Sequence, residues 1–379
     1  MKSIIFLQPH FNIYSGGSKF VLEVVNRLNK KKINIIIITA SINKQILEPY
    51  KDIKIDLIKI PSPKNLLFWI FFPIWQLKIN KKIKKYDPKI IVANSFPSNW
   101  WAGFYKIYNR KVRYIWYCHE PSPFIYSRAW INSIENKFMR VGAKISSPIL
   151  KLIDQYLTKK VDHILTNGNF NAKQIEKIYS RKVTEIIYPG VDTKFLRPGT
   201  TKDNYILSAG CLAKFKNIDL LIKAFNQIKN KDIKLKIVGT GPAQKELIKL
   251  TLKLKNKDKI IFLGDVNEKN LINLYKQAKI FLLCSINEPF GMVLIEAMAC
   301  GTPVIAINSG GPKEIIINKK TGFLIQPDEK DLTKHLEILL DNDEIIKNFG
   351  ENARIRALNF DWKKTITQFK NLLDTISKN

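Results

Sequence analysis

Short apolar runs alternate with amphipathic stretches along most of the chain. In the first half, a helical pattern over residues 17–29 follows a glycine-rich turn. Buried strands are predicted there over residues 3–7, 33–39, 90–93, 114–118 and 163–166. A second series of strands is predicted over residues 205–209, 235–238, 260–263, 280–284 and 303–306. Strands that alternate with helices form parallel sheets covered on both faces. The pattern therefore predicts an α/β protein of two doubly wound, Rossmann-like halves that face each other across a cleft.

The two series are separated by a polar segment that contains proline and glycine and begins near residue 195. A chain of 379 residues is long enough for two domains. We expect one domain over residues 1–195, a second over 204–358, and a separate final helix within 359–379.

The most informative segment is 284–303, where a buried strand is followed by a turn and a helix. The turn carries Glu288 and is closed by Pro289 and Gly291, and the helix is predicted to begin at about Met292 and to carry Glu296. N–H groups at a helix start attract anions. A carboxylate beside them is tolerated if it faces a neutral, hydroxyl-rich group, such as a sugar attached to a phosphate.

The spacing of the two glutamates is wide. On one continuous helix they would lie about 12 Å apart, whereas paired glycosidase carboxylates lie roughly 5–9.5 Å apart. Glu288 and Glu296 thus suit opposite ends of one elongated ligand. The alternative is a pair of solvated helix glutamates.

Other strand ends of the second half also lead into small or polar residues. Gly210 precedes Lys216, a natural phosphate ligand, and Gly239 and Gly241 follow the next strand. These two glycines lack the third glycine of a dinucleotide fingerprint. All these corners meet at one edge of the sheet and are expected to line an elongated pocket.

In the first half, Gly16 and Gly17 open a helix after the first strand and let the backbone approach a diphosphate. His119 follows the strand over residues 114–118. A histidine at a strand end is more often structural than catalytic.

The net charge of +31 indicates either a compositional habit of the source or an anionic partner. An aromatic run over residues 66–77 is followed by a lysine cluster that ends at Lys85, which suits an interfacial segment on an anionic membrane. The alternative is a buried helix with a solvated basic face. No apolar run is long enough to span a bilayer. We expect the amino terminus to form a strand and not a signal peptide.

The four cysteines are Cys118, Cys211, Cys284 and Cys300, and no two of them form a C-x-x-C pair. This spacing suggests neither a zinc site nor a disulfide framework. We therefore expect the protein to be located in the reducing cytoplasm. No metal-binding Asp-x-Asp loop is evident, so no metal or other cofactor is expected.

Several motifs together resemble the retaining, nucleotide-sugar-dependent glycosyltransferases of family 4, which have the GT-B fold. They are Glu288 with Glu296, Gly210 with Lys216, Val-Gly-Thr-Gly-Pro at 238–242, Phe-Leu-Gly-Asp-Val at 262–266 and Gly-Thr-Pro-Val-Ile at 301–305. The resemblance spans almost the whole chain and implies that Glu288, His119 and Lys216 are catalytic. The donor-binding residues that it implies are Gly16, Gly17, Gly210, Cys211, Lys214, Gly239, Gly241, Val266, Phe290, Gly291, Met292, Val293 and Glu296.

One position departs from the family pattern. Cys211 stands where the family usually has arginine after the glycine. In the family pattern two cations hold the diphosphate, and here only Lys216 remains unless another basic residue, such as Lys214, replaces the arginine. We call these cations the diphosphate clamp.

The resemblance further implies that residues 1–195 bind the acceptor, that 204–358 bind the nucleotide-sugar, and that the final helix crosses back to the first domain. The expected reaction moves a hexose, with mannose as one option, from a nucleoside-diphosphate sugar to a glycan or lipid-linked acceptor. The enzyme is expected to be peripheral on the inner face of an anionic membrane, with no role in binding nucleic acid. The rival hypotheses are a non-enzymatic GT-B relic that binds an anionic polymer, and a phosphorolytic or hydrolytic enzyme of the same fold.

Overall fold

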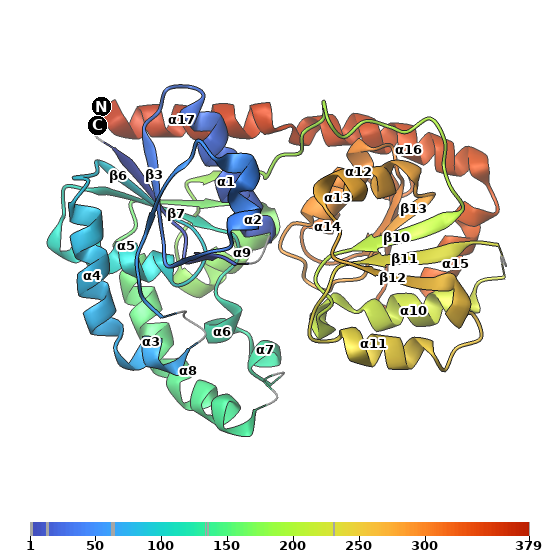
Figure 1. Cartoon of the computed structure of the whole chain (residues 1–379), viewed down its shortest axis with the longest axis horizontal. Coiled ribbons are helices and arrows are strands. Elements are labelled where there is room, and N and C mark those ends of the chain that lie inside the picture. The colour runs from blue at the N-terminus through green and yellow to red at the C-terminus, as the bar shows by residue number, and fades with distance from the viewer. Residues whose placement is uncertain are drawn as a thin grey trace. The chain divides into compact units, whose positions relative to one another are not determined.

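The computed structural model describes residues 3–12, 15–61, 65–132, 134, 136–229 and 232–378. Tyr14, which precedes the two glycines of the predicted glycine-rich turn, lies outside the described residues. The chain divides into two compact units, residues 1–188 together with 366–379 and residues 189–365. Each unit contains its own parallel sheet with helices on both sides (Figure 1).

The first unit is built on a seven-stranded parallel sheet of order β5-β3-β1-β6-β7-β8-β9. Its strands are β1 Ile4–Leu7, β3 Ile35–Thr39, β5 Lys54–Leu57, β6 Ile90–Ala93, β7 Arg113–Cys118, β8 His163–Thr166 and β9 Glu185–Ile186, and a separate small pair is β2 His10–Phe11 with β4 Ser41–Ile42. The order reverses between β1 and β6, which makes this the topological switch point.

The helices of the first unit cover both faces of this sheet. They are α1 Gly16–Asn29, α2 Lys44–Leu47, the 3₁₀ helix η1 Glu48–Tyr50, α3 Leu66–Ile70, α4 Phe72–Lys84, α5 Ser98–Tyr108, α6 Pro123–Tyr126, α7 Arg128–Asn132, α8 Lys137–Thr158 and α9 Asn169–Tyr179. The strands β1 and β6 at the switch point are apolar at every position and buried, as expected for strands covered on both faces.

The second unit has a six-stranded parallel sheet of order β12-β11-β10-β13-β14-β15, with its switch point between β10 and β13. Its strands are β10 Tyr205–Ala209, β11 Lys234–Val238, β12 Ile260–Gly264, β13 Ile280–Leu283, β14 Val304–Ile307 and β15 Gly322–Ile325. Its helices are η2 Lys214–Lys216, α10 Ile218–Gln227, α11 Gln244–Thr251, η3 Lys257–Lys259, α12 Glu268–Gln277, α13 Met292–Ala299, α14 Pro312–Ile315, α15 Glu329–Leu340, α16 Asp343–Ala357 and η4 Leu358–Phe360. The last helix, α17 Trp362–Lys378, starts in this unit and ends in the first.

The division between the units falls at residue 188, earlier than the boundary expected at 195. The segment after it packs on the second unit, where Arg354 donates to the carbonyl oxygens of Thr193 and Leu196 at 2.8 and 2.7 Å. The later part of α17 packs on the first unit, where the ring centroid of Phe369 lies 5.9 Å from that of Phe6.

Within the described ranges, none of the helices combines the length and the apolar content needed to cross a membrane.

Candidate active site

In the second unit, an ion pair forms at the switch point of the sheet. Lys216 follows β10 and Glu288 follows β13, the two neighbouring strands at which the order reverses. The Nζ atom of Lys216 donates to Oε2 of Glu288 at 2.6 Å. The side chains are only 19% and 13% exposed, respectively. The two residues chosen from the sequence are thus in direct contact, at the place where doubly wound sheets bind ligands.

Local backbone geometry brings Lys216 to this position. Lys216 ends the short 3₁₀ helix η2, and Asn217 then takes a left-handed conformation with φ of 48°. The Nδ2 atom of Asn217 donates to the carbonyl oxygen of Cys284 at 3.2 Å, which ties the turn after β10 to the end of β13. Asn217 was not among the predicted residues, although it directly follows Lys216 in the sequence.

The Glu288 loop is supported from behind by two glycines after β14. The N–H of Gly311 donates to the carbonyl oxygen of Glu288 at 2.8 Å. A Cβ atom on Gly310 would lie 2.4 Å from that same oxygen, and one on Gly311 would lie 2.4 Å from Cα of Phe290. The hydroxyl of Ser309 also donates to Oδ1 of Asn287 at 2.6 Å. The two glycines therefore permit a close backbone approach that fixes the loop.

Helix α13 begins at Met292, as the sequence predicted, after Gly291 with φ of 100°. It carries Glu296, which is buried and accepts a hydrogen bond from the hydroxyl of Tyr275 at 3.1 Å. Burial, followed by the nearby Glu296 carboxylate, raises the pKa of the Tyr275 hydroxyl well above its usual value, so Tyr275 stays protonated and can only donate to Glu296. Glu296 is therefore not a solvated helix residue. Tyr275 is a positioning residue that no sequence signal indicated.

The remaining predicted glycines of this unit divide into two kinds. A Cβ atom on Gly239 would lie 2.0 Å from the carbonyl oxygen of Gly210, and one on Gly241 would lie 2.5 Å from that of Leu212. Both are explained by the close packing of the loops after β10 and β11. Gly210 has φ of 147°, and a Cβ atom there would meet no atom within 4 Å. Its backbone thus borders open space, as a ligand-binding backbone should.

The proposed substitute cation lies at the same corner. Cys211 is exposed, and Lys214 is exposed in η2 with its Nζ atom 3.5 Å from Oε2 of Glu246. Exposed ion pairs of this kind contribute little, about 0–1 kcal/mol, so Glu246 holds Lys214 only weakly.

Of the other predicted donor-binding residues, Phe290 is buried with its ring 5.9 Å from that of Phe360, which leaves only its backbone for a ligand. Met292 and Val293 are half-buried in the first turn of α13, and Val266 is half-buried just after β12.

The first unit has a matching cluster at its own switch point. Gly16 and Gly17 begin α1 after β1, and the side chain of Ser15 caps this helix by accepting from the N–H of Ser18 at 3.2 Å. A Cβ atom on Gly17 would lie 3.5 Å from Oγ of Ser95 and 3.6 Å from Nε2 of His119. The structure thus brings Gly17 and His119 together and adds Ser95, which follows β6 and was missed.

His119 is held by its backbone and leaves its ring nitrogen unbonded. Its carbonyl oxygen accepts from Nδ2 of Asn167 at 3.0 Å and from Nδ2 of Asn171 at 2.9 Å. Its Nε2 atom is enclosed and has no hydrogen-bond partner among the described residues. Burial lowers the pKa of His119 to about 4, so the imidazole is neutral near pH 7. His119 is therefore a neutral hydrogen-bonding group beside Gly17 and not a cation.

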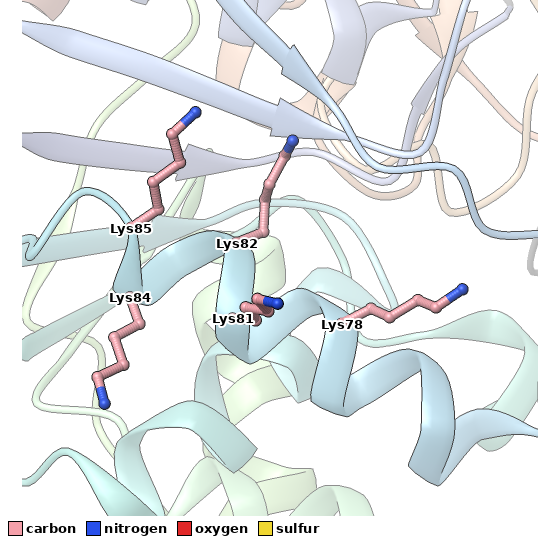
Figure 2. Close-up of a pocket in the computed structure, with 5 residues that line it drawn as sticks. All are labelled: Lys78, Lys81, Lys82, Lys84 and Lys85. Atoms are coloured by element: carbon pink, nitrogen blue, oxygen red, sulfur yellow. The ribbon is translucent and has the colours of Figure 1, made fainter.

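The predicted aromatic and lysine-rich segment forms α3 and α4, and its residues divide between core and surface. Phe68, Ile79 and Ile83 are buried, whereas the apolar side chains of Leu67, Ile70, Phe71, Ile74 and Leu77 are exposed. Figure 2 shows the surface pocket that Lys78, Lys81, Lys82, Lys84 and Lys85 line, with side chains that point in different directions. Lys82 is paired with Asp56 at 2.7 Å. The site residues above contribute nothing to this pocket.

Among the described residues, no group of three or more His, Cys, Asp or Glu side chains is placed to hold a metal ion.

Two family profiles match the chain, one after the other. The profile described as Glycosyltransferase Family 4 matches residues 14–195, and the one described as Glycosyl transferases group 1 matches residues 193–356. The chain is a family 4 glycosyltransferase. Solved structures show that this glycosyltransferase has the GT-B fold. They include Anabaena Alr3699/HepE in complex with UDP and glucose, with a TM-score of 0.80, 19% identity and coverage of 99% of this chain and 100% of that chain. Sucrose-phosphate synthase from Thermosynechococcus elongatus has a TM-score of 0.83, 20% identity and full coverage of both chains.

The relatives of this glycosyltransferase include enzymes that are named for a specific transfer. One is the N-acetylgalactosamine-N,N'-diacetylbacillosaminyl-diphospho-undecaprenol 4-alpha-N-acetylgalactosaminyltransferase of Campylobacter jejuni, 28% identical, with 93% of this chain and 94% of the relative aligned. Another is the alpha-1,3/1,6-mannosyltransferase ALG2 of Candida glabrata, 26% identical, with 96% and 91% aligned. The predictions of family and fold are confirmed.

Proposed function

We propose that this glycosyltransferase moves a hexose from a nucleoside-diphosphate sugar to a glycan or lipid-linked acceptor, with retention of the anomeric configuration. The observation that carries the proposal is the Lys216–Glu288 ion pair at the switch point of the second unit. One cation and one carboxylate in contact suit a ligand that is anionic at one end and rich in hydroxyls at the other. A sugar diphosphate has this composition.

In the proposed reaction, the bond between the sugar and the diphosphate breaks, and negative charge collects on the diphosphate. The ammonium of Lys216, held about 2.6 Å from Glu288, can donate further N–H groups to this charge. The N–H groups at the start of α13 add to the stabilisation, because they point out of the helix at its positive end. Preorganised donors of this kind stabilise the leaving group without reorganisation.

The other predicted residues take roles that follow from their surroundings. Glu288 is proposed to accept from sugar hydroxyls and Glu296, oriented by Tyr275, from ribose hydroxyls. Gly210 offers open backbone to the diphosphate. Lys214 is proposed to provide the second cation in place of the arginine that Cys211 replaces. His119, as a neutral group, is proposed to lie near the transferred sugar.

The names of two relatives support a lipid-linked acceptor and mannose as one candidate sugar. The Campylobacter jejuni relative is named for transfer to a diphospho-undecaprenol-linked sugar, and the Candida glabrata relative for mannosyl transfer. We extend this class of acceptor to the present enzyme and propose a hexose, with mannose among the sugars to be tested. The HepE complex with UDP and glucose supports a nucleotide-sugar donor.

The first experiment is a donor screen by thermal shift with UDP-, GDP- and ADP-sugars, followed by transfer assays with the stabilising donor. Lys216→Ala and Glu288→Ala should each remove most transfer while the fold is retained. Lys223→Ala, which alters another lysine of the same unit in contact with a carboxylate, is the matched control. Wild-type turnover in either site variant would remove that residue from the mechanism.

The products decide between the hypotheses. An α-linked product from an α-linked donor, identified by nuclear magnetic resonance, indicates retention, and a β-linked product would contradict it. Release of free sugar or sugar phosphate in the presence of acceptor would instead favour a hydrolytic or phosphorolytic enzyme. Failure to bind any nucleotide-sugar while an anionic polymer binds would favour the relic. We also expect transfer to persist in EDTA, and a loss that Mg²⁺ restores would disprove metal independence.

We further propose that the enzyme is peripheral on the inner, cytoplasmic face of an anionic membrane. The exposed apolar side chains of α3 and α4, next to a lysine cluster, support this placement. The test is sedimentation with anionic vesicles of a variant in which the exposed lysines Lys78, Lys81 and Lys84 are changed to glutamate. Lys82 is left intact because it is paired with Asp56. The matched control changes the exposed residues Lys249, Lys253 and Lys269 of the second unit. Unchanged sedimentation of the first variant would mean that the cluster is only a solvated face.

A further inference from the structure

Helix α8 exposes a continuous apolar stripe that the proposed reaction does not use. The stripe consists of Phe138, Val141, Ile145, Ile149, Leu152 and Tyr156, whose exposed fractions range from 50 to 91%. At 3.6 residues per turn, these six positions fall within about 80° of the helix circumference. Large apolar side chains are rarely exposed side by side in a soluble protein without a partner. The stripe is therefore a candidate docking surface.

The opposite face of α8 is firmly attached to the first unit, which leaves the stripe on the outside. Asp154 is buried in the centre of this attachment and accepts from four side chains: Asn99 at 3.0 Å, Trp100 at 2.6 Å, Tyr126 at 2.9 Å and Tyr179 at 2.6 Å. Ser147 is also buried and donates to the carbonyl oxygen of Ile125 at 3.0 Å. The orientation of α8 is thus fixed by this polar network together with the apolar side chains on its inner face, such as the buried Leu157.

The charges around the stripe have one sign. The cations of this segment are Lys137, Arg140, Lys144, Lys151, Lys159 and Lys160. Asp154 is the one acidic residue between positions 137 and 160 of the sequence, and it is buried. By the helical period, Lys137, Arg140, Lys144 and Lys151 lie along one flank of the stripe. An apolar stripe with a basic flank is typical of helices that lie in the surface of an anionic membrane.

Helix α8 also shares a hydrophobic cluster with α3 and α4. Leu150 and Ile153 of α8 pack in the same cluster as Trp69 of α3 and Phe72 of α4. Figure 1 shows α3 next to α8 in the first unit. Helices α3, α4 and α8 are therefore neighbours within the first unit.

We propose that the α8 stripe inserts into the interface of an anionic lipid bilayer and provides the apolar part of membrane attachment. The cations beside it attract anionic headgroups, and the stripe buries its aliphatic side chains among the acyl chains. The inference rests on the proposed peripheral placement of the enzyme. It adds a lipid-inserting helix to the lysine-rich segment, and its test requires neither donor nor acceptor.

A second copy of the chain is a weaker choice of partner for this surface. Two α8 helices packed stripe to stripe would bring two basic flanks together with no exposed acidic residue of either helix to compensate. Like charges across an interface disfavour association. The whole chain carries a net charge of +31, which adds to this repulsion and to the attraction of an anionic bilayer.

The test is sedimentation of the full-length protein with vesicles of phosphatidylglycerol and phosphatidylcholine in equal parts. The variant combines Ile145→Ser, Ile149→Ser and Leu152→Ser, all at exposed positions that should not affect folding. The matched control combines Ile248→Ser, Ile355→Ser and Leu252→Ser, which removes the same residue types from exposed positions of the second unit. A conservative variant exchanges the three stripe residues for other aliphatic residues, Ile145→Leu, Ile149→Leu and Leu152→Ile.

We expect the serine variant to lose about a thousandfold in vesicle partitioning, because each of the three inserted aliphatic side chains contributes about tenfold. The matched control and the conservative variant should partition like the wild type. Circular dichroism checks that each variant is folded. Wild-type partitioning of the serine variant would overturn the proposal. If the wild type is a dimer that the serine variant converts to a monomer, the surface is an interface between two copies and the proposal is also wrong. Glycosyl transfer to a soluble acceptor should be unchanged in the serine variant, so a failure of this inference is distinguishable from a failure of the proposed reaction.

Discussion

Gly311→Ala should move the Glu288 loop without altering any residue that is proposed to touch the donor. Gly311 has φ of −60° and ψ of −34°, a conformation that alanine adopts without strain. The effect is therefore purely steric. The new Cβ atom would lie 2.4 Å from Cα of Phe290 and 2.5 Å from its carbonyl oxygen, whereas ordinary contact begins at 3.4 Å. The overlap is thus 3.4 − 2.4 = 1.0 Å.

The size of this overlap determines the expected losses of reaction rate and of stability in Gly311→Ala. Both neighbouring atoms belong to backbone, so a side-chain rotation cannot relieve it and the loop that carries Glu288 must shift by about 1 Å. A misplacement of that size costs about a hundredfold in rate. Overpacking of a dense site costs about 1–3 kcal/mol of stability, which lowers the Tm of a domain of this size by about 2–12 °C.

The assay is kcat/KM for transfer to a soluble acceptor, measured together with thermal unfolding. Gly142→Ala is the control, because a Cβ atom there meets nothing within 4 Å. It lies within α8 and should stabilise the protein by about 0.5–1 kcal/mol and leave the rate unchanged. Near-wild-type kcat/KM in Gly311→Ala would show that the position of the Glu288 loop does not limit the reaction, and would refute the assignment of the site.

Three further outcomes are expected. Gly17→Ala should keep wild-type stability, since its Cβ atom would lie at an ordinary contact distance of 3.5 Å from Oγ of Ser95. The new methyl group should weaken substrate binding in calorimetry, because it blocks the approach of a ligand to this backbone; unchanged binding would mean that Gly17 serves only in packing. Burial lowers the pKa of His119 to about 4, so the neutral imidazole should contribute its full stability above pH 6.5 and lose it as the pH falls toward 4. The loss in the free energy of unfolding, measured in urea, should be roughly 1–3 kcal/mol. His119→Gln should remove this pH dependence, and a variant with the pH profile of the wild type would contradict the prediction. Cys211→Arg should tighten donor binding by about ten- to a hundredfold through one added charge-assisted hydrogen bond, whereas equal or weaker calorimetric affinity in a folded variant would indicate that Lys214 already completes the clamp.

The central strands could be predicted because strands buried on both faces are continuous apolar runs. The predicted strands over residues 90–93, 163–166 and 205–209 match β6, β8 and β10, respectively, residue for residue. The strands that were missed have other physical reasons to exist. β5 is a partly exposed edge strand with two charged residues, and β9 has only two residues. β15 begins at Gly322, where a Cβ atom would lie 1.9 Å from the carbonyl oxygen of Val304. Strands β5 and β9 are thus set by their neighbours and not by their own hydrophobicity, whereas β15 is a short apolar strand whose first residue is glycine, a residue depleted in strands.

The site could be predicted where a strand end and a charged residue coincide in the sequence. Lys216 and Glu288 were found in this way and do meet in space. Residues that position Lys216 and Glu296 were not found, because their contacts span long separations along the chain. Asn217, for example, fixes the turn at Lys216 by donating to the carbonyl oxygen of Cys284. Tyr275 lies on α12 and reaches Glu296 on α13, and no periodicity of either helix indicates this pair. The exposed stripe of α8 was missed for a related reason, since an apolar helical period is the same whether its face is buried or exposed.

The two switch points differ in charge, and this difference suggests a division of labour. In the second unit a cation and a carboxylate are held in contact, so charged parts of a substrate have defined partners there. In the first unit the corresponding cluster has a neutral His119 beside Gly17 and Ser95, and burial keeps the imidazole uncharged. A neutral imidazole contributes little attraction to a diphosphate, but it can exchange hydrogen bonds with a hydroxyl. Loss of His119 should therefore lower kcat more than donor affinity, whereas loss of Lys216 should lower both. If His119→Ala weakened donor binding as much as Lys216→Ala does, the imidazole would have to be charged in the complex, and the division of labour would be wrong.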